Sequence, residues 1–117
     1  MQVRTVTVIG TGTMGSGIAQ VCAQSGWQTR LFDAFPESLE KGMNNINQFW
    51  DKGISKGKTT LEQKEKWSLN LETHTDLTKA VENTDLVIEA VPEIMNLKKE
   101  IFIQLEKIAP KHAILAT

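Results

Sequence analysis

Three glycines near the N-terminus have the spacing of a turn that can hold a phosphate group. They are the glycines of the run Gly10-Thr11-Gly12-Thr13-Met14-Gly15. An apolar run precedes them and a helical pattern follows, which is the strand–turn–helix context that gives this spacing meaning. The first glycine permits a tight turn, the second leaves room for a pyrophosphate, and the third lets the helix pack closely on the sheet. The first helical turn then offers unpaired N–H groups and a positive dipole end.

A carboxylate stands at the end of the next strand-like segment. Residues 28–32 have a strand pattern and Asp33 follows them, 23 positions after Gly10. At about this spacing an acidic residue accepts hydrogen bonds from the ribose hydroxyls of a dinucleotide. The carboxylate would repel a 2′-phosphate, and the next residues are Ala34 and Phe35 rather than an arginine. The two motifs together predict a site for NAD rather than NADP, with an ordinary glycine-rich turn as the structural alternative.

Composition limits the class of protein. A chain of 117 residues is long enough for one domain with a real core. Thirteen basic and fourteen acidic residues give a net charge of −1, which does not favour a nucleic-acid surface. No apolar run approaches the ~20 residues that span a bilayer, and the N-terminal residues lack a signal-segment pattern. The single Cys22 excludes an internal disulfide, and we expect it to be buried in a cytoplasmic protein.

Strand and helix patterns alternate along the chain. We expect strands at 3–9, 28–33, 69–73, 85–91 and 113–117. We expect helices at 13–25 and 37–56, a short helix that begins at Thr59 or Thr60, a short helix at 76–81, and a last helix from Pro92-Glu93 that buries Ile94, Leu97, Ile101, Leu105 and Ile108. This order predicts an α/β fold, a Rossmann-type doubly wound parallel sheet of order 3-2-1-4-5. Ligands of such sheets bind at the carboxyl ends of the strands, where Gly10, Asp33, Val91, Glu93 and Thr117 stand.

The helical segment between the second and third strands is too long for a plain crossover. Long insertions often carry binding surfaces, and the alternative is a solvated helical pair with no ligand. Its Gly53–Thr59 stretch looks like a nucleotide-binding P-loop. However, it has three residues instead of four between its glycines and follows a helix instead of a strand. We therefore predict no P-loop there.

Several stretches resemble the 3-hydroxyacyl-CoA dehydrogenases. They are Val8–Gln20, Asp85–Glu93, Leu97–Phe102, Ile108–Pro110 and Ala113–Thr117, and the resemblance spans essentially the whole chain. It implies oxidation of the 3-hydroxyl of an acyl-CoA to a ketone in fatty acid metabolism, with NAD taking the hydride. It also places Glu93 and Lys98 near the nicotinamide half of the cofactor and Lys56 near the phosphates of CoA. The cofactor contacts that we expect are Gly10, Thr11, Gly12, Thr13, Met14, Gly15, Asp33, Ala90, Val91, Glu93 and Lys98.

These roles have structural alternatives. Glu93 also suits the first turn of its helix, and Lys56 and Lys98 also suit a solvated surface. In the resembling family the catalytic histidine lies beyond the fifth strand, and neither His74 nor His112 matches it. Oxidation of a hydroxyl needs a base to take its proton.

We therefore interpret residues 1–117 as an NAD-binding domain without its catalytic residues, its substrate domain or the helical domain that makes the parent a homodimer. We expect this piece to be inactive and to self-associate through apolar surface that the missing domain would cover. A stand-alone NAD sensor without catalysis is the alternative of another class. A dehydrogenase of the related β-hydroxyacid type is a third possibility, against which Pro92-Glu93 argues.

Overall fold

The fold is built on one five-stranded parallel sheet. The computed structural model describes residues 4–90, 101, 103–104, 107–110 and 114–116. The strands are β1 (Thr5–Ile9), β2 (Gln28–Phe32), β3 (Leu71–His74), β4 (Leu86–Glu89) and β5 (Ile114–Ala116). Their order is β3-β2-β1-β4-β5 and each neighbouring pair is parallel. The predicted fold class and strand order are confirmed.

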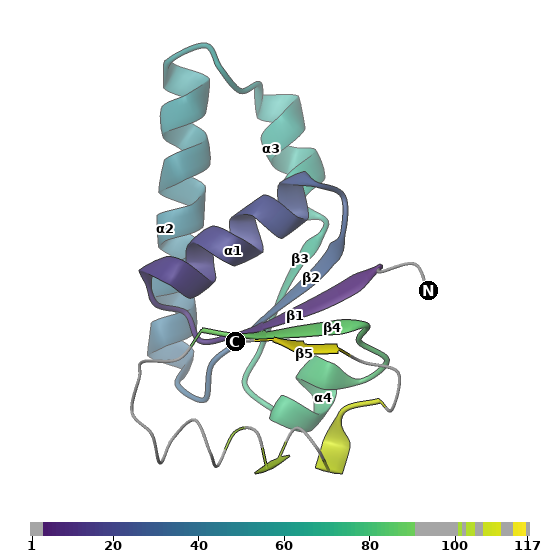
Figure 1. Ribbon diagram of the computed structural model, residues 1–117. Coiled ribbons are helices and arrows are strands. Elements are labelled where there is room, and N and C mark those ends of the chain that lie inside the picture. The colour runs from purple at the N-terminus through teal and green to yellow at the C-terminus, as the bar shows by residue number, and fades with distance from the viewer. Residues whose placement is uncertain (1–3, 91–100, 102, 105–106, 111–113, 117) are drawn as a thin grey trace.

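Helices lie on both faces of this sheet, as Figure 1 shows. One face carries α1 (Thr13–Gln24), α2 (Pro36–Ser55) and α3 (Leu61–Ser68), and the other carries α4 (Leu77–Val81). Because parallel strands need crossover connections, the chain returns over one face and then over the other. No helix in the described part of the chain is long and apolar enough to cross a membrane.

Alternate residues of the strands supply two separate cores. On the α1 side, Val6, Val8 and Leu31 belong to a cluster that also contains Trp50 of α2 and the buried Cys22. On the α4 side the cluster is Ile9, Phe32, Ala80, Val81 and Val87, with Leu77, Ile101 and Ile108 packed against it. Two members of the predicted last helical stripe thus pack as expected, and Ile94, Leu97 and Leu105 lie outside the described residues.

Most predicted ends of elements are confirmed to within two residues. Gly26 ends α1 with φ +90°, and Pro36 occupies the first turn of α2. The stretch that looks like a P-loop begins inside α2, so no strand precedes it. The third strand begins at Leu71 instead of residue 69, because Leu69 terminates α3.

The run Thr59-Thr60-Leu61-Glu62 predicts a capping box of Thr59 and Glu62 at the start of α3, and this prediction is wrong by one residue. The box is formed by Thr60, whose Oγ1 accepts a hydrogen bond from the Gln63 amide, while the Gln63 side chain accepts one from the Thr60 amide. Thr59 belongs to the preceding turn, since its amide donates to the carbonyl of Gly53. Because α3 begins at Leu61, Thr60 is its N-cap residue.

Candidate functional site

The residues that follow β1, β2 and β4 come together at one edge of the sheet. The amide of Gly10 donates to the carbonyl of Phe32 at 2.9 Å, and the amide of Ala90 donates to the carbonyl of Ile9 at 2.8 Å. The amide of Asp33 donates to the carbonyl of His74 at 3.3 Å. These bonds continue the ladder past the strand ends and hold Gly10, Asp33 and Ala90 side by side at the carboxyl edge.

The glycine turn has the shape that its spacing predicts. Gly10 has φ +104°, a conformation that L side chains rarely adopt. A Cβ on Gly15 would lie 1.9 Å from the carbonyl oxygen of Gly10 and 3.5 Å from the Cβ of Ala90. A Cβ on Gly12 would meet nothing within 4 Å. The first and third glycines are therefore required by the backbone and the packing, whereas the space beside Gly12 is open.

The first turn of α1 faces this open space with its amides. Gly12 is the N-cap residue of α1, and the helical hydrogen bonds begin with the Ser16 amide on the Gly12 carbonyl at 2.9 Å. No side chain of the described residues caps this end, and its first turn contains no acidic residue. Thr13 and Met14 are exposed there. Free amides and the positive end of the helix dipole together suit an anion such as a phosphate.

The carboxylate of Asp33 is held in a fixed orientation beside the turn. Its Oδ2 accepts a hydrogen bond from Thr11 Oγ1 at 2.8 Å, and its Oδ1 accepts one from the Phe35 amide at 3.0 Å. Each carboxylate oxygen has lone pairs left for further donors, and the residue is only half-buried. A vicinal diol, which can donate two hydrogen bonds, suits this carboxylate.

Thr11 is in turn fixed by the helices behind it. The Thr11 side chain is buried, and its carbonyl accepts a hydrogen bond from Ser16 Oγ at 2.9 Å. A Cβ on Gly42 of α2 would lie 3.0 Å from Ser16 Oγ and 3.1 Å from Thr11 Cβ. The sequence indicates Gly42 only as a weak point of a long helix, whereas it lets α2 pack directly on the glycine turn. The roles of Gly42, Ser16 and the Thr11 hydroxyl were missed because no spacing rule describes them.

A second acidic residue lies at the same edge and is buried. Glu89 ends β4, pairs in register with Ile9, and is only 4% exposed. Charged side chains are rarely buried without partners. The only signal of Glu89 in the sequence is its position in an apolar strand, and it belongs to neither of the two motifs.

The remaining predicted residues do not all join this site. Lys56 follows the last residue of α2 and is exposed. Asp33 lies just before the start of α2, and a helix of 20 residues is about 30 Å long. Lys56, which follows the other end, therefore lies far from Asp33. Val91, Glu93 and Lys98 lie outside the described residues, as does His112. His74 ends β3 with its Nε2 3.1 Å from Oε2 of Glu72.

The parallel sheet, the glycine turn and the oriented carboxylate define the class of Rossmann-type dinucleotide-binding domains. The family model described as 3-hydroxyacyl-CoA dehydrogenase, NAD binding domain, matches residues 5–117. The chain therefore belongs to this family, and its cofactor is NAD. The resemblance expected from the sequence is confirmed.

Named relatives agree with this assignment. The chain is 38% identical over 117 residues to a probable 3-hydroxybutyryl-CoA dehydrogenase of Bacillus subtilis, covering 100% of this chain and 40% of the relative. It is 39% identical over 117 residues to the 3-hydroxyadipyl-CoA dehydrogenase of Escherichia coli, covering 100% of this chain and 24% of the relative. The chain thus spans less than half the length of these curated relatives.

Solved structures of the family have the same fold. The 3-hydroxybutyryl-CoA dehydrogenase from Escherichia coli K12 matches with a TM-score of 0.92 and 38% identity, over 98% of this chain and 24% of that one. The (S)-3-hydroxybutyryl-CoA dehydrogenase from Ralstonia eutropha matches with a TM-score of 0.93 and 33% identity, over 98% of this chain and 41% of that one.

Proposed function

We propose that these 117 residues are the cofactor-binding part of an enzyme that oxidises a 3-hydroxyacyl-CoA to the 3-ketoacyl-CoA. In this proposal the pyrophosphate of NAD lies on Gly10, Gly12 and the first turn of α1, and the adenosine ribose lies on Asp33. The orientation of the Asp33 carboxylate next to an uncapped helix N-terminus is the observation that carries the proposal. Ala90 completes the edge, and Val91, Glu93 and Lys98 extend the proposed site toward the nicotinamide.

The choice between the two nicotinamide cofactors follows from charge. A carboxylate that accepts a hydrogen bond from the 2′-hydroxyl of NAD repels the negatively charged 2′-phosphate of NADP. The side chain of Thr11 already supplies one donor to Asp33, and the Phe35 backbone supplies the other. We therefore expect NAD to bind and NADP to bind more weakly by at least about tenfold, which is 1.4 kcal/mol.

The substrate and the catalytic step belong to the proposal for the whole enzyme. Lys56, beyond the far end of α2, is proposed to contact the phosphates of CoA, which places the acyl-CoA along the helical segment between β2 and β3. The catalytic base is proposed to lie outside these 117 residues, because neither His74 nor His112 matches the position of the family's catalytic histidine. The whole enzyme is proposed to be a cytoplasmic homodimer. The isolated 117-residue chain is proposed to self-associate and to lack catalytic activity.

The cofactor assignment is tested by calorimetric titration of NAD into wild-type protein and Asp33→Ala. Removing an acceptor of two ribose hydroxyls is expected to weaken NAD binding by at least tenfold, because hydrogen bonds to charged groups contribute about 1.5–3 kcal/mol. Asp51→Ala is the matched control, since Asp51 is an exposed aspartate of α2 bonded to Lys64. Equal NAD affinity in wild type and Asp33→Ala would overturn the ribose assignment.

The catalytic part has its own assay. The chain is mixed with NAD and 3-hydroxybutyryl-CoA, and absorbance at the NADH band is followed. We expect no NADH above the rate without protein, because a hydroxyl without a base does not lose its proton. Sustained NADH production would show that a base for the reaction exists within these 117 residues.

A further inference from the structure

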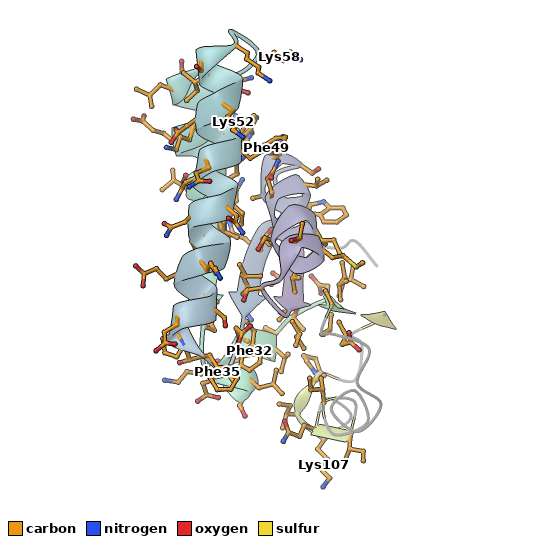
Figure 2. All side chains as sticks on the ribbon, turned by 90° about the vertical axis from the view of Figure 1, so that its left-hand side faces the viewer. Phe32, Phe35, Phe49, Lys52, Lys58 and Lys107 are labelled. Atoms are coloured by element: carbon orange, nitrogen blue, oxygen red, sulfur yellow. The ribbon has the colours of Figure 1, made fainter. Side chains whose placement is uncertain are left out.

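Phe35 leaves a large apolar ring in water at the carboxyl edge of the sheet. Its side chain is 68% exposed, whereas Phe32, three residues earlier, is buried in the core on the α4 side. Figure 2 shows Phe35 at the N-terminal end of α2, with Phe49, Lys52 and Lys58 further along toward the other end. An exposed aromatic residue two positions after Asp33 is thus a surface feature of the proposed cofactor site.

The backbone of Phe35 is fixed from both sides. Its amide donates to Asp33 Oδ1 at 3.0 Å, and its carbonyl accepts from the Ser38 amide at 3.1 Å and the Leu39 amide at 3.2 Å. The following residue is Pro36, which disfavours helical backbone at Phe35, and Phe35 indeed has φ −107° and ψ 117°. The ring is therefore attached to a rigid point whose position relative to the Asp33 carboxylate is set by a hydrogen bond.

We propose that the ring of Phe35 is a stacking platform for the adenine base of NAD. The inference rests on the proposed function, in which Asp33 holds the adenosine ribose. The base is attached to the ribose carbon next to the one that carries the 2′-hydroxyl. Two residues of extended chain span at most about 7 Å, so a ring on Phe35 is within reach of a base whose ribose lies on Asp33. Stacking on an aromatic side chain is a general way of binding a purine.

The neighbours of Phe35 leave room for such a base. Ala34, Pro36 and Glu37 are exposed, and Ala34 has only a methyl group. None of the four residues from 34 to 37 belongs to either core cluster. A base that covered the ring would remove apolar surface from water on both partners, which favours binding. Phe35 would then add affinity for the adenosine half, whereas Asp33 selects its ribose.

The test compares Phe35→Ala with Phe49→Ala in calorimetric titrations of NAD and of AMP. Phe49 is the matched control, because it is a phenylalanine of α2, the helix that Phe35 precedes, and it is 59% exposed and fourteen residues further along. Phe35→Ala is expected to weaken the binding of NAD and of AMP by the same factor, about tenfold in Kd, because both ligands carry the adenine base. Phe49→Ala is expected to bind both ligands as wild type does. Phe35→Trp is expected to restore affinity, with its indole fluorescence quenched by AMP.

The outcomes separate this inference from the proposed function. If Phe35→Ala binds NAD and AMP with wild-type affinity while Asp33→Ala does not, the stacking role is overturned and the cofactor site stands. A loss of NAD affinity without a loss of AMP affinity would also overturn it, because the ring would then act away from the base. If wild type binds neither ligand, both proposals fail. Should Phe35→Ala melt at a much lower temperature, Phe35→Trp decides the question by its AMP-dependent quenching.

Discussion

Replacement of Thr11 with valine tests whether the Asp33 carboxylate must be pre-oriented. Thr11 is 7% exposed, and its Oγ1 donates to Asp33 Oδ2 at 2.8 Å. Valine has nearly the same shape, so the substitution removes one donor and leaves the packing in place. Water can reach the half-buried Asp33 in the free protein. The free energy of unfolding should therefore fall by about 1 kcal/mol or less.

Cofactor affinity should respond differently from stability. When a ribose covers Asp33, water no longer replaces the missing hydroxyl, and the carboxylate has to be ordered by the ligand itself. A hydrogen bond to a charged group contributes about 1.5–3 kcal/mol, and the partial exposure of Asp33 reduces this figure. We expect a loss of about 1 kcal/mol in NAD binding, roughly fivefold in Kd, measured by titration calorimetry at fixed ionic strength.

The control for this experiment is Thr11→Ser, which keeps the hydroxyl and loses only a methyl group. We expect the serine variant to bind NAD within about twofold of wild type. Wild-type affinity in Thr11→Val would refute the pre-orientation argument. Equal losses of NAD affinity in the valine and serine variants would assign the effect to packing of the side chain instead.

Three other substitutions test local features of the fold. Gly15→Ala places a methyl group against the Gly10 carbonyl oxygen and should lower the free energy of unfolding, measured in urea, by at least about 2 kcal/mol. Gly17→Ala, with open space around its Cβ, should be neutral or stabilising. Equal effects of the two substitutions would contradict the packing argument. Burial raises the pKa of the Cys22 thiol, so its contribution to stability is complete below the pKa of the unfolded thiol and is lost as pH rises through the folded value. Between pH 8 and pH 10 the unfolding free energy of wild type should thus fall more than that of Cys22→Ala, and parallel pH profiles would be the contrary result. Thr60→Ala removes a capping side chain and should cost about 1 kcal/mol in the same urea assay, with Thr60→Ser near wild type.

The parts of the site that sequence predicts are those with fixed local geometry. Gly10 and Gly15 are required by a positive φ and by a close approach within one turn, and both constraints act over six residues. Asp33 was predictable because a parallel strand ends where its neighbours end, so a fixed spacing along the chain becomes a fixed place at the edge. The alternation of strand and helix segments along the chain likewise predicts the strand order before any contact is known.

The parts that sequence does not predict depend on contacts between distant segments. Gly42 lies 31 positions after Thr11, and only the packing of α2 on the turn brings the two residues together. The capping box is formed by Thr60 instead of Thr59, because Thr59 belongs to the turn in which its amide is bonded to Gly53, and α3 begins only at Leu61. In both cases the sequence shows the residue type, a glycine in a helix and a threonine before one. The close approach of α2 to the turn gives Gly42 its role, and the start of α3 decides which threonine is the cap.

The cofactor edge therefore works as a single structural unit made by three connections. Ser16 of α1 holds the backbone of Thr11, and the Thr11 hydroxyl holds Asp33. Asp33 in turn holds the amide of Phe35, the N-cap residue of α2. The same residues that turn the chain at the glycines thus also fix where α2 starts. Asp33 is thus bonded to the N-terminal end of α2, whose other end lies about 30 Å away, next to Lys56. The helix that separates the proposed cofactor and CoA contacts is anchored at the cofactor end by the carboxylate that we assign to the ribose.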